Sequence, residues 1–380
     1  MLLMNSRPSS CVSTISGTRT APKLCASTTG VLFAFVVTII LFVEALLAFS
    51  CGPADARQSS SPSTTWAVTI VLPPKLVAGR RATLAVLGVD GRLASGVTIN
   101  LSDGQHVTTD RTGRASFVVP ATGQGYVLAI GSGASVSALV DSARPVDESR
   151  PAVIDSFAAL STPFSICAGG LSGDADANRV EINGEPALVL GSSPECAVML
   201  PGRKLAPGPA KVSIEGPGVR YEATTTLVSL ECEYPKPTLE PGKKGMLVVH
   251  VRGSDEKLRI VVENGTPGVL RFLQGPRQEI VTTGGAENIA TVKVEALSSG
   301  DYSFRAHLLN SPDVPTALRF LQLAEPLAPA GLQHDIKNLR NHLAEHPRNF
   351  AAARQQLGEL ISEAITGDFR TLLSAADSAL

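Results

Sequence analysis

The amino-acid sequence predicts a mainly β protein with three small β-sandwich domains in tandem, an apolar helix near the N-terminus and a short α-helical segment at the C-terminus. Aromatic residues make up only 4% of the 380 residues, whereas Gly and Pro number 34 and 26. Thin sandwiches built from Val and Thr need little aromatic bulk. Segments of alternating apolar residues recur between turn pairs at intervals of about 8–12 residues, which is the spacing of a sandwich. The apolar period becomes helical only near the C-terminus.

The charge balance and the absence of catalytic motifs argue against two broad classes of function. The formal net charge is -1, so no long-range attraction draws the chain to nucleic acid. The sequence has no glycine-rich phosphate loop, no dinucleotide fingerprint and no G-x-S-x-G elbow. His342, Glu345 and His346 match a zinc-protease pattern, but too few residues follow to supply a third ligand. We therefore expect a protein that is not an enzyme, has no cofactor and does not bind nucleic acid.

The N-terminal region predicts export to the cell envelope. Residues 1–30 carry only basic charges, at Arg7, Arg19 and Lys23, and residues 31–50 are almost entirely apolar. Basic residues before an apolar stretch hold the N-terminus in the cytoplasm. The stretch has about the ~20 residues that a bilayer span needs. We expect residues 31–50 to be a signal or membrane-anchor segment, with the body of the protein outside the cytoplasm.

Three kinds of processing remain open for this segment. The four residues that end at Cys51 read Ala-Phe-Ser-Cys and resemble a bacterial lipoprotein box, which makes Cys51 a candidate lipid anchor. The box departs from the usual pattern because Ala stands where Leu is common and because Phe49 is bulky. Cleavage after Ala56 fits an A-x-A site, and an uncleaved anchor is the third possibility. A Ser/Pro-rich tether at 51–65 precedes the first domain.

Residues 66–141 are expected to form the first sandwich. Strand-like segments alternate with turn pairs such as Asp90-Gly91 and Asp103-Gly104. The stretch 107–117 resembles a hairpin of bacterial Ig-like and carboxypeptidase-regulatory-like domains. In that hairpin Asp110 would bond to its own turn backbone and Gly113 would supply a positive φ. The resemblance implies a structural role.

Residues 151–231 are expected to form the second sandwich. Four segments carry the pattern: Pro151–Phe157, Val180–Ala187, Cys196–Pro201 and Leu205–Ile214. Their order, with an opening Pro, a V-x-I-N-G hairpin, a short strand that ends in Pro and a final strand after Pro-Gly, is similar to IPT/TIG-type Ig-like domains. Such domains are structural or binding modules, so the resemblance implies no catalytic residue.

The C-terminal part is expected to change from strands to helices. Residues 238–323 are predicted to form a third Ig-like sandwich, residues 324–331 a Pro/Ala linker, and residues 332–380 a helical segment. Residues 349–380 resemble a single degenerate tetratricopeptide motif. One such repeat cannot bury its apolar face alone, so it must pack on the third sandwich, on the preceding helix or on another chain.

Two cysteines of the second sandwich are candidates for a disulfide. Cys167 and Cys196 both lie on predicted strands, and a bond between them can persist outside the cytoplasm. The chain-entropy argument gives such a loop a stabilisation of roughly 3–4 kcal/mol. Cys232 is then left over, or it pairs with one of the two instead.

A calcium site is a further candidate in this domain. Asp174, Asp176, Asn178 and Glu185 have the spacing of positions 1, 3, 5 and 12 of a calcium-binding loop. Arg179 stands where the sharp turn of such a loop needs Gly, and the flanking residues are strand-like. A polar loop between strands is the competing interpretation.

The sequence thus predicts a non-enzymatic, membrane-anchored Ig-like scaffold or adhesion protein of the cell envelope. Its partner is expected to be a protein or a cell-surface glycan. The alternative is an accessory subunit of an envelope complex that docks through its C-terminal helices.

Overall fold

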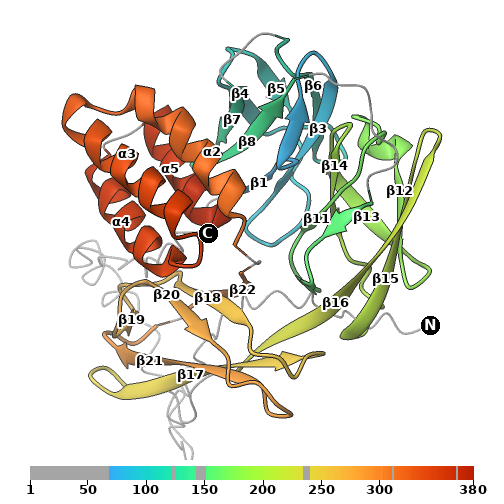
Figure 1. Cartoon of the computed structure of the whole chain (residues 1–380). Helices are drawn as coiled ribbons and strands as arrows, with labels where there is room; N and C mark the ends of the chain where they lie inside the picture. The colour runs from blue at the N-terminus through green and yellow to red at the C-terminus, as the bar shows by residue number, and fades with distance from the viewer. Residues whose placement is uncertain are drawn as a thin grey trace, which may run out of the picture.

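The computed structural model describes residues 68–121, 125–142, 151–233, 240–300, 302–309, 312–364 and 367–380. The predicted apolar helix at 31–50, the candidate anchor Cys51 and the tether at 51–65 lie outside these residues. Within the described part of the chain, no helix is both long enough and apolar enough to cross a membrane. Strands make up most of the regular structure, and the α-helices of the described residues are confined to the C-terminal part (Figure 1).

The first unit, residues 68–142, is a sandwich of two sheets, one of which continues into the second unit where Thr83 pairs with Ser192. One sheet contains β1 (Thr69–Val71), β3 (Arg81–Leu87) and β6 (Arg114–Val118). The other has the order β2 (Lys75–Val77), β8 (Ala134–Asp141), β7 (Tyr126–Gly131), β4 (Thr98–Leu101) and β5 (His106–Thr108). Alternate residues of each strand meet in one core, because successive side chains point to opposite faces. In the predicted turn, the Asp110 carboxylate accepts hydrogen bonds from two backbone N–H groups and Gly113 has a φ of +70°.

The second and third units share one long strand. The second unit contains β9 (Val153–Ile154), β10 (Phe157–Ala159), β11 (Phe164–Cys167), the 3-10 helix η1 (Ala175–Ala177), β12 (Arg179–Ile182), β13 (Glu185–Ser192), β14 (Cys196–Leu200), β15 (Gly208–Gly216) and the first part of β16 (Val219–Glu233). The third contains the end of β16, β17 (Lys244–Arg252), β18 (Arg259–Asn264), β19 (Leu270–Phe272), β20 (Arg277–Val281), β21 (Ile289–Ala296) and β22 (Phe304–Leu308). β16 pairs with β15 up to Leu227 and with β17 from Ser229 onward. Leu227 belongs to one core and Val228 to the next, so the two cores are contiguous.

The helical unit starts earlier than the sequence predicted. It contains α2 (Val314–Ala324), the 3-10 helix η2 (Glu325–Leu327), α3 (Ala330–Glu345), α4 (Phe350–Glu363) and α5 (Asp368–Ala379). The expected third sandwich at 238–323 is therefore too long, since its last strand ends at Leu308. Asp313 caps α2 and Pro315 occupies its first turn, and both features favour a helix start. Part of the expected linker at 324–331 likewise belongs to η2 and α3.

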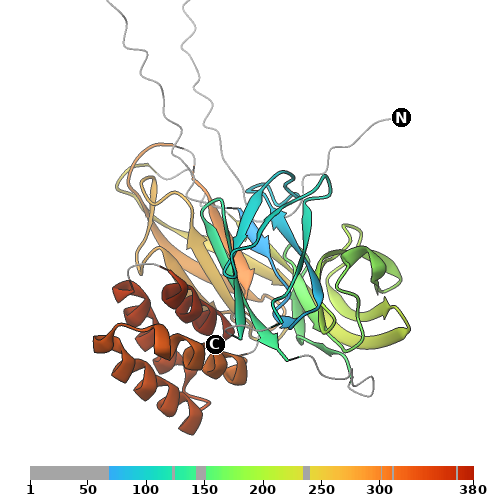
Figure 2. The same cartoon turned by 90° about the horizontal axis from the view of Figure 1, so that it is seen from above.

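The four units do not form an open row, because the helical unit folds back between the first and third units (Figures 1 and 2). Tyr126, Leu128 and Leu139 of the first unit are buried in the core of the helices. On the other side, the Arg354 guanidinium of α4 donates to the carboxylate of Glu279 on β20. The Arg259 guanidinium of β18 donates to the Leu380 carbonyl oxygen at 3.3 Å, so the last residue of the chain also lies against the third unit.

Candidate functional site

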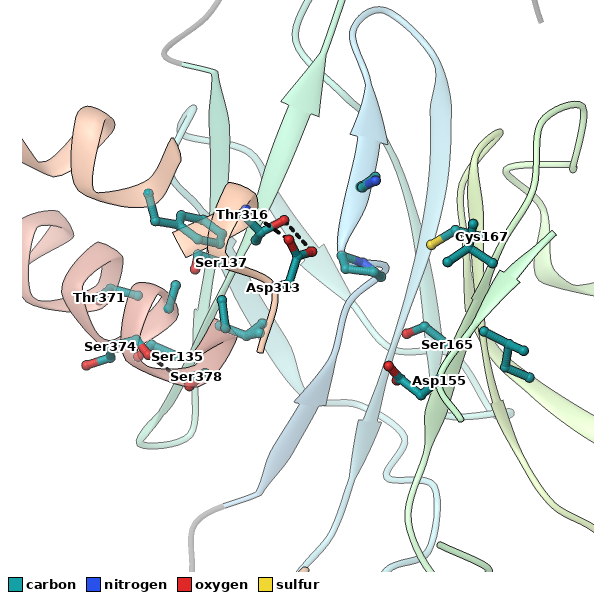
Figure 3. Close-up of a pocket in the computed structure, with 18 residues that line it drawn as sticks. Ser135, Ser137, Asp155, Ser165, Cys167, Asp313, Thr316, Thr371, Ser374 and Ser378 are labelled. Atoms are coloured by element: carbon teal, nitrogen blue, oxygen red, sulfur yellow. Dashed lines mark hydrogen bonds between the residues drawn. The ribbon is translucent and has the colours of Figure 1, made fainter. Parts of the chain in front are cut away.

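A cavity of about 460 Å³ lies where the first unit, the second unit and the helical unit meet. Its volume is within the usual range of ligand pockets. Most of its polar lining consists of hydroxyl groups, from Ser135, Ser137, Ser165, Thr316, Thr371, Ser374 and Ser378. Figure 3 shows the hydroxyls of the helices on one side and Asp155, Ser165 and Cys167 on the other. We call this space the junction cavity.

The first wall is an edge of β8 that β2 leaves uncovered. β1 pairs with β3 in one sheet, whereas β2 pairs with β8 in the other. Pro73 and Pro74 lie between β1 and β2, and a proline has no N–H to donate to a ladder, so the chain changes sheets there. β2 covers β8 only at Leu139–Asp141. Ser135 and Ser137 therefore lie on a part of the edge that no strand of the described residues covers.

The second wall comes from a similar change of sheet in the second unit. β9 pairs with β11, and β10 then pairs in parallel with β16. The backbone between them is held by the Thr225 hydroxyl, which donates to the Asp155 carbonyl oxygen at 2.8 Å. β9 is the last strand of its sheet, and the side chain of Val153 on it is 66% exposed.

The third wall is formed by the start of α2 and the last turns of α5. The Asp313 backbone N–H donates to the Ala379 carbonyl oxygen at 2.7 Å, which joins the two helices. The Asp313 carboxylate caps α2, accepting from the Thr316 N–H at 3.1 Å and from the Thr316 hydroxyl at 2.7 Å. Thr371, Ser374 and Ser378 lie on one face of α5, because residues three and four apart are neighbours on a helix.

The charges of the cavity are unbalanced. Asp155 and Asp313 contribute carboxylates, and Lys75 is the basic residue in the lining. Burial raises the pKa of Asp155, and the nearby charge of Asp313 raises it further. The Ser137 hydroxyl oxygen is buried without a hydrogen-bond partner among the described residues. The cavity therefore offers unused hydrogen-bonding groups and an excess of negative charge.

The lining offers several groups that can bind a ligand. No His lines the cavity, and the sulfur of Cys167 is bonded to Cys196. The Thr316 hydroxyl is bonded to the Asp313 carboxylate, and that bond belongs to the cap of α2. What the lining provides is hydroxyls, carboxylates and open sheet edges.

The structure joins Cys167 and Cys196 in a disulfide between β11 and β14, with an S–S distance of 2.09 Å. Its position beside the junction cavity could not be read from the spacing of the two cysteines. Cys232 is also disulfide-bonded, so it is not the leftover cysteine that the sequence allowed.

The four candidate calcium ligands do not come together. Asp174 caps η1, and the Asp176 carboxylate forms an ion pair with Arg114. The Asn178 side chain is hydrogen-bonded to Ser172 and Ser192. Glu185 lies at the opposite end of β12, about 10 Å farther along at ~3.3 Å per residue. Among the described residues no group of three or more His, Cys, Asp or Glu could hold a metal ion. The calcium prediction is therefore wrong, and the polar-loop interpretation fits these contacts.

Sequence reasoning did not single out Asp155 or Asp313. The Pro73-Pro74 pair signals an interrupted strand, and Asp313 two residues before Pro315 signals a helix start. Either signal could have been noticed. Neither says that the two aspartates face the same cavity, because that depends on how the units pack.

Comparisons with known proteins give no family. No protein-family model matches the chain, and no curated protein matches it. SGBP-B of the Bacteroides ovatus mixed-linkage glucan utilization locus, solved with a mixed-linkage heptasaccharide, is 12% identical over 62% of this chain and 73% of that chain, with a TM-score of 0.23.

Proteins with Ig domains are also among the similar structures. A structure of titin domains is 12% identical, covers 64% of this chain and 94% of that chain, and has a TM-score of 0.18. The four N-terminal Ig domains of Dscam1 are 11% identical, with 61% and 73% covered and a TM-score of 0.20. These TM-scores are low, so the matches carry no argument about what this chain binds.

Proposed function

We propose that this protein is a non-enzymatic binding scaffold of the cell envelope, held at the membrane by its N-terminal region, and that its ligand binds in the junction cavity. The observation that carries the proposal is that three structural units together build one partly open cavity, lined by hydroxyl and carboxylate groups among apolar ones. The proposal includes three Ig-like sandwiches, with an IPT/TIG-type second sandwich.

Contacts outside the cavity hold its walls in place. Between the first and second units, the Thr83 hydroxyl donates to the Gly173 carbonyl oxygen at 2.7 Å, and the Ser193 hydroxyl donates to the Lys75 carbonyl oxygen at 2.6 Å. Between the first and helical units, Arg319 donates to the Asp141 carboxylate. A site whose walls are already fixed loses less entropy when a ligand binds.

Docking of a partner onto the C-terminal helices has less support. The apolar residues of α3, α4 and α5 are buried among themselves, against α2 and against the first unit. Leu327 is the one large apolar side chain that the described helical unit exposes. We propose that the tetratricopeptide-like motif at 349–380 is a packing element of the scaffold.

The first test concerns export and anchoring. The full-length chain, expressed with its own N-terminus, is expected in the membrane fraction with its body open to protease added outside the cytoplasm. Intact mass distinguishes the anchors: a diacylglyceryl mass on a chain that starts at Cys51 indicates the lipoprotein, and a start at Met1 indicates a retained helix. A body that stays protected inside the cytoplasm would refute the proposal.

The second test concerns the cavity. A diazirine-bearing amino acid is placed at Ser135 or Ser378, which are exposed in the cavity lining, and at the exposed Asp335 of α3 as a matched control. Irradiation of the full-length protein in its native membrane is expected to give a defined adduct at the two cavity positions and none at Asp335. Equal labelling at all three positions, or no adduct at any, would contradict binding in the cavity.

A further inference from the structure

The backbone of β8 presents free hydrogen-bonding groups to the junction cavity. The Val140 N–H points toward β7, where it donates to the Gly125 carbonyl oxygen at 2.9 Å. The Leu139 N–H points to the other edge, where it donates to the Pro74 carbonyl oxygen at 3.1 Å. Alternate residues of a strand direct their backbone groups to the same edge. The N–H and C=O groups of Ser135 and Ser137 therefore point away from β7, to the edge that lines the cavity.

This uncovered edge is long enough for a short strand. It runs over residues 134–138, which span about 13 Å at ~3.3 Å per residue. A chain placed here would continue the line of β2, which pairs with β8 only from Leu139 onward. Unpaired edges readily accept a further strand, and many binding proteins recognise extended peptides in this way.

The opposite wall of the cavity is also a sheet edge, and it is apolar. β9 consists of Val153 and Ile154, and it carries no charge of the kind that usually protects an edge strand. The Val153 side chain is 66% exposed at this edge. An apolar side chain of a bound peptide would find a partner there.

The charges of the cavity specify one more property of the occupant. Asp155 and Asp313 repel one another, and the basic residue of the lining, Lys75, leaves one negative charge in excess. A cationic side chain between the two carboxylates would form charge-assisted hydrogen bonds with them.

We propose that the junction cavity binds an extended peptide segment that carries a Lys or Arg side chain. The peptide adds as a strand to β8 at Ser135 and Ser137, and its basic side chain lies between Asp155 and Asp313. This inference deepens the proposed function and rests on it, since it names the class of ligand for the same cavity.

The test uses the purified full-length protein and defined fluorescent peptides. The parent peptide is Thr-Val-Arg-Val-Thr, and its neutral control replaces Arg with Gln. Two further peptides carry N-methyl groups on alternate backbone amides, one peptide on the odd-numbered amides and the other on the even-numbered amides. Whichever set of amides faces β8, one of the two peptides lacks the N–H groups needed for pairing. Fluorescence anisotropy is expected to show that the Arg peptide binds about tenfold more tightly than the Gln peptide, and that at least one N-methylated register loses about tenfold or more.

Protein variants locate the peptide. Ser135→Pro removes one of the two N–H groups that face the cavity and is expected to weaken binding about tenfold or more. Ser135→Ala keeps that N–H and is expected to lose less affinity than Ser135→Pro. Proline is tolerated on an edge strand where its missing N–H had no partner. Asp155→Asn is expected to reduce the preference for Arg over Gln, and the exposed control Asp335→Asn is expected to leave it unchanged.

Each of these measurements can overturn the inference. Binding that ignores N-methylation in both registers excludes strand addition, and equal affinity for the Arg and Gln peptides excludes the basic side chain. If no peptide binds while the cavity positions still give a photo-adduct with another class of molecule, such as a saccharide, the inference fails and the proposed function stands. If no peptide binds and no photo-adduct forms at the cavity positions, both the inference and the proposed function fail.

Discussion

The hydroxyl of Tyr126 on β7 donates a hydrogen bond of 3.3 Å to the carboxylate of Asp368, the first residue of α5. The two residues are 242 positions apart, so this bond joins the first sandwich to the last helix. Burial raises the pKa of Tyr126 to about 12, and the charge and hydrogen bond of Asp368 contribute to the shift. The fold is thus closed by a contact between its earliest and latest units.

Removing that hydroxyl is expected to weaken the contact between the helical unit and the first sandwich. Tyr126→Phe should lower the free energy of unfolding by about 0.5–1.5 kcal/mol, the usual net value of one hydrogen bond. Urea denaturation followed by circular dichroism measures the change. In a spectrophotometric titration, Asp368→Asn should let Tyr126 ionise at lower pH, because it removes the neighbouring negative charge. Unchanged stability of Tyr126→Phe would show that the bond contributes nothing.

The contact between the helical unit and the third unit depends on Arg354. Its guanidinium donates to Glu279 and, at 3.2 Å, to Asp377, and its side chain is only 12% exposed. Arg354→Ala should cost about 1.5–3 kcal/mol, because hydrogen bonds to charged groups are strong and two carboxylates lose a partner. Arg370→Ala on the exposed side of α5 is the matched control and should change little. Equal losses in the two variants, measured in guanidinium chloride, would contradict this role.

Ionisation of Asp155 should make the folded protein less stable as the pH rises. Its pKa is raised from 3.8 in the folded protein, so the folded state favours the protonated form and the ionised form is destabilising. At neutral pH the penalty is fully present, and Asp155→Asn should be more stable than the wild type. The difference should shrink as the pH falls through the raised pKa and disappear below 3.8, where the wild-type carboxyl is protonated in both states. Urea unfolding at several pH values tests this, and a difference that is constant with pH would refute it.

Replacement by alanine is expected to have opposite effects on stability at Gly173 and at Gly358. A Cβ atom on Gly173 would lie 1.8 Å from the Arg81 carbonyl oxygen, so the second unit packs on the first only without that atom. Gly173→Ala should cost about 1–3 kcal/mol through overpacking. Gly358 lies in α4 with no neighbouring atom within 4 Å of such a Cβ, and Gly358→Ala should add about 0.5–1 kcal/mol of helix stability. The unfolding temperatures of the two variants should shift in opposite directions, and a shift in the same direction would contradict either the crowding at Gly173 or the open space at Gly358.

Local patterns predicted individual elements well. The V-x-I-N-G segment forms the hairpin of β12 and β13, with positive φ values at Asn183 and Gly184. The helical segment predicted from residue 332 is present in α3, where Ile336, Leu339 and Leu343 are buried at helical spacing. These features depend on residues that are close in sequence, so the local sequence pattern is enough to predict them.

The junction cavity could not be predicted in the same way. Alternation along β8 shows which side chains are buried, but it does not show which strand covers the edge at Ser135. Whether Asp155 approaches Asp313 depends on the packing of the second unit against the helical unit. The predicted third sandwich extends too far because its range, 238–323, includes the helix start marked by Asp313 and Pro315.

The 15-residue strand β16 has a mechanical consequence for the second and third units. Because the same strand crosses two cores, the second and third units lack a flexible joint at this point. A pull along β16 would load its hydrogen bonds to β15 and β17 in shear, so the load is spread over many bonds at once. The strand therefore makes the second and third units resist tension along its axis as one stiff element.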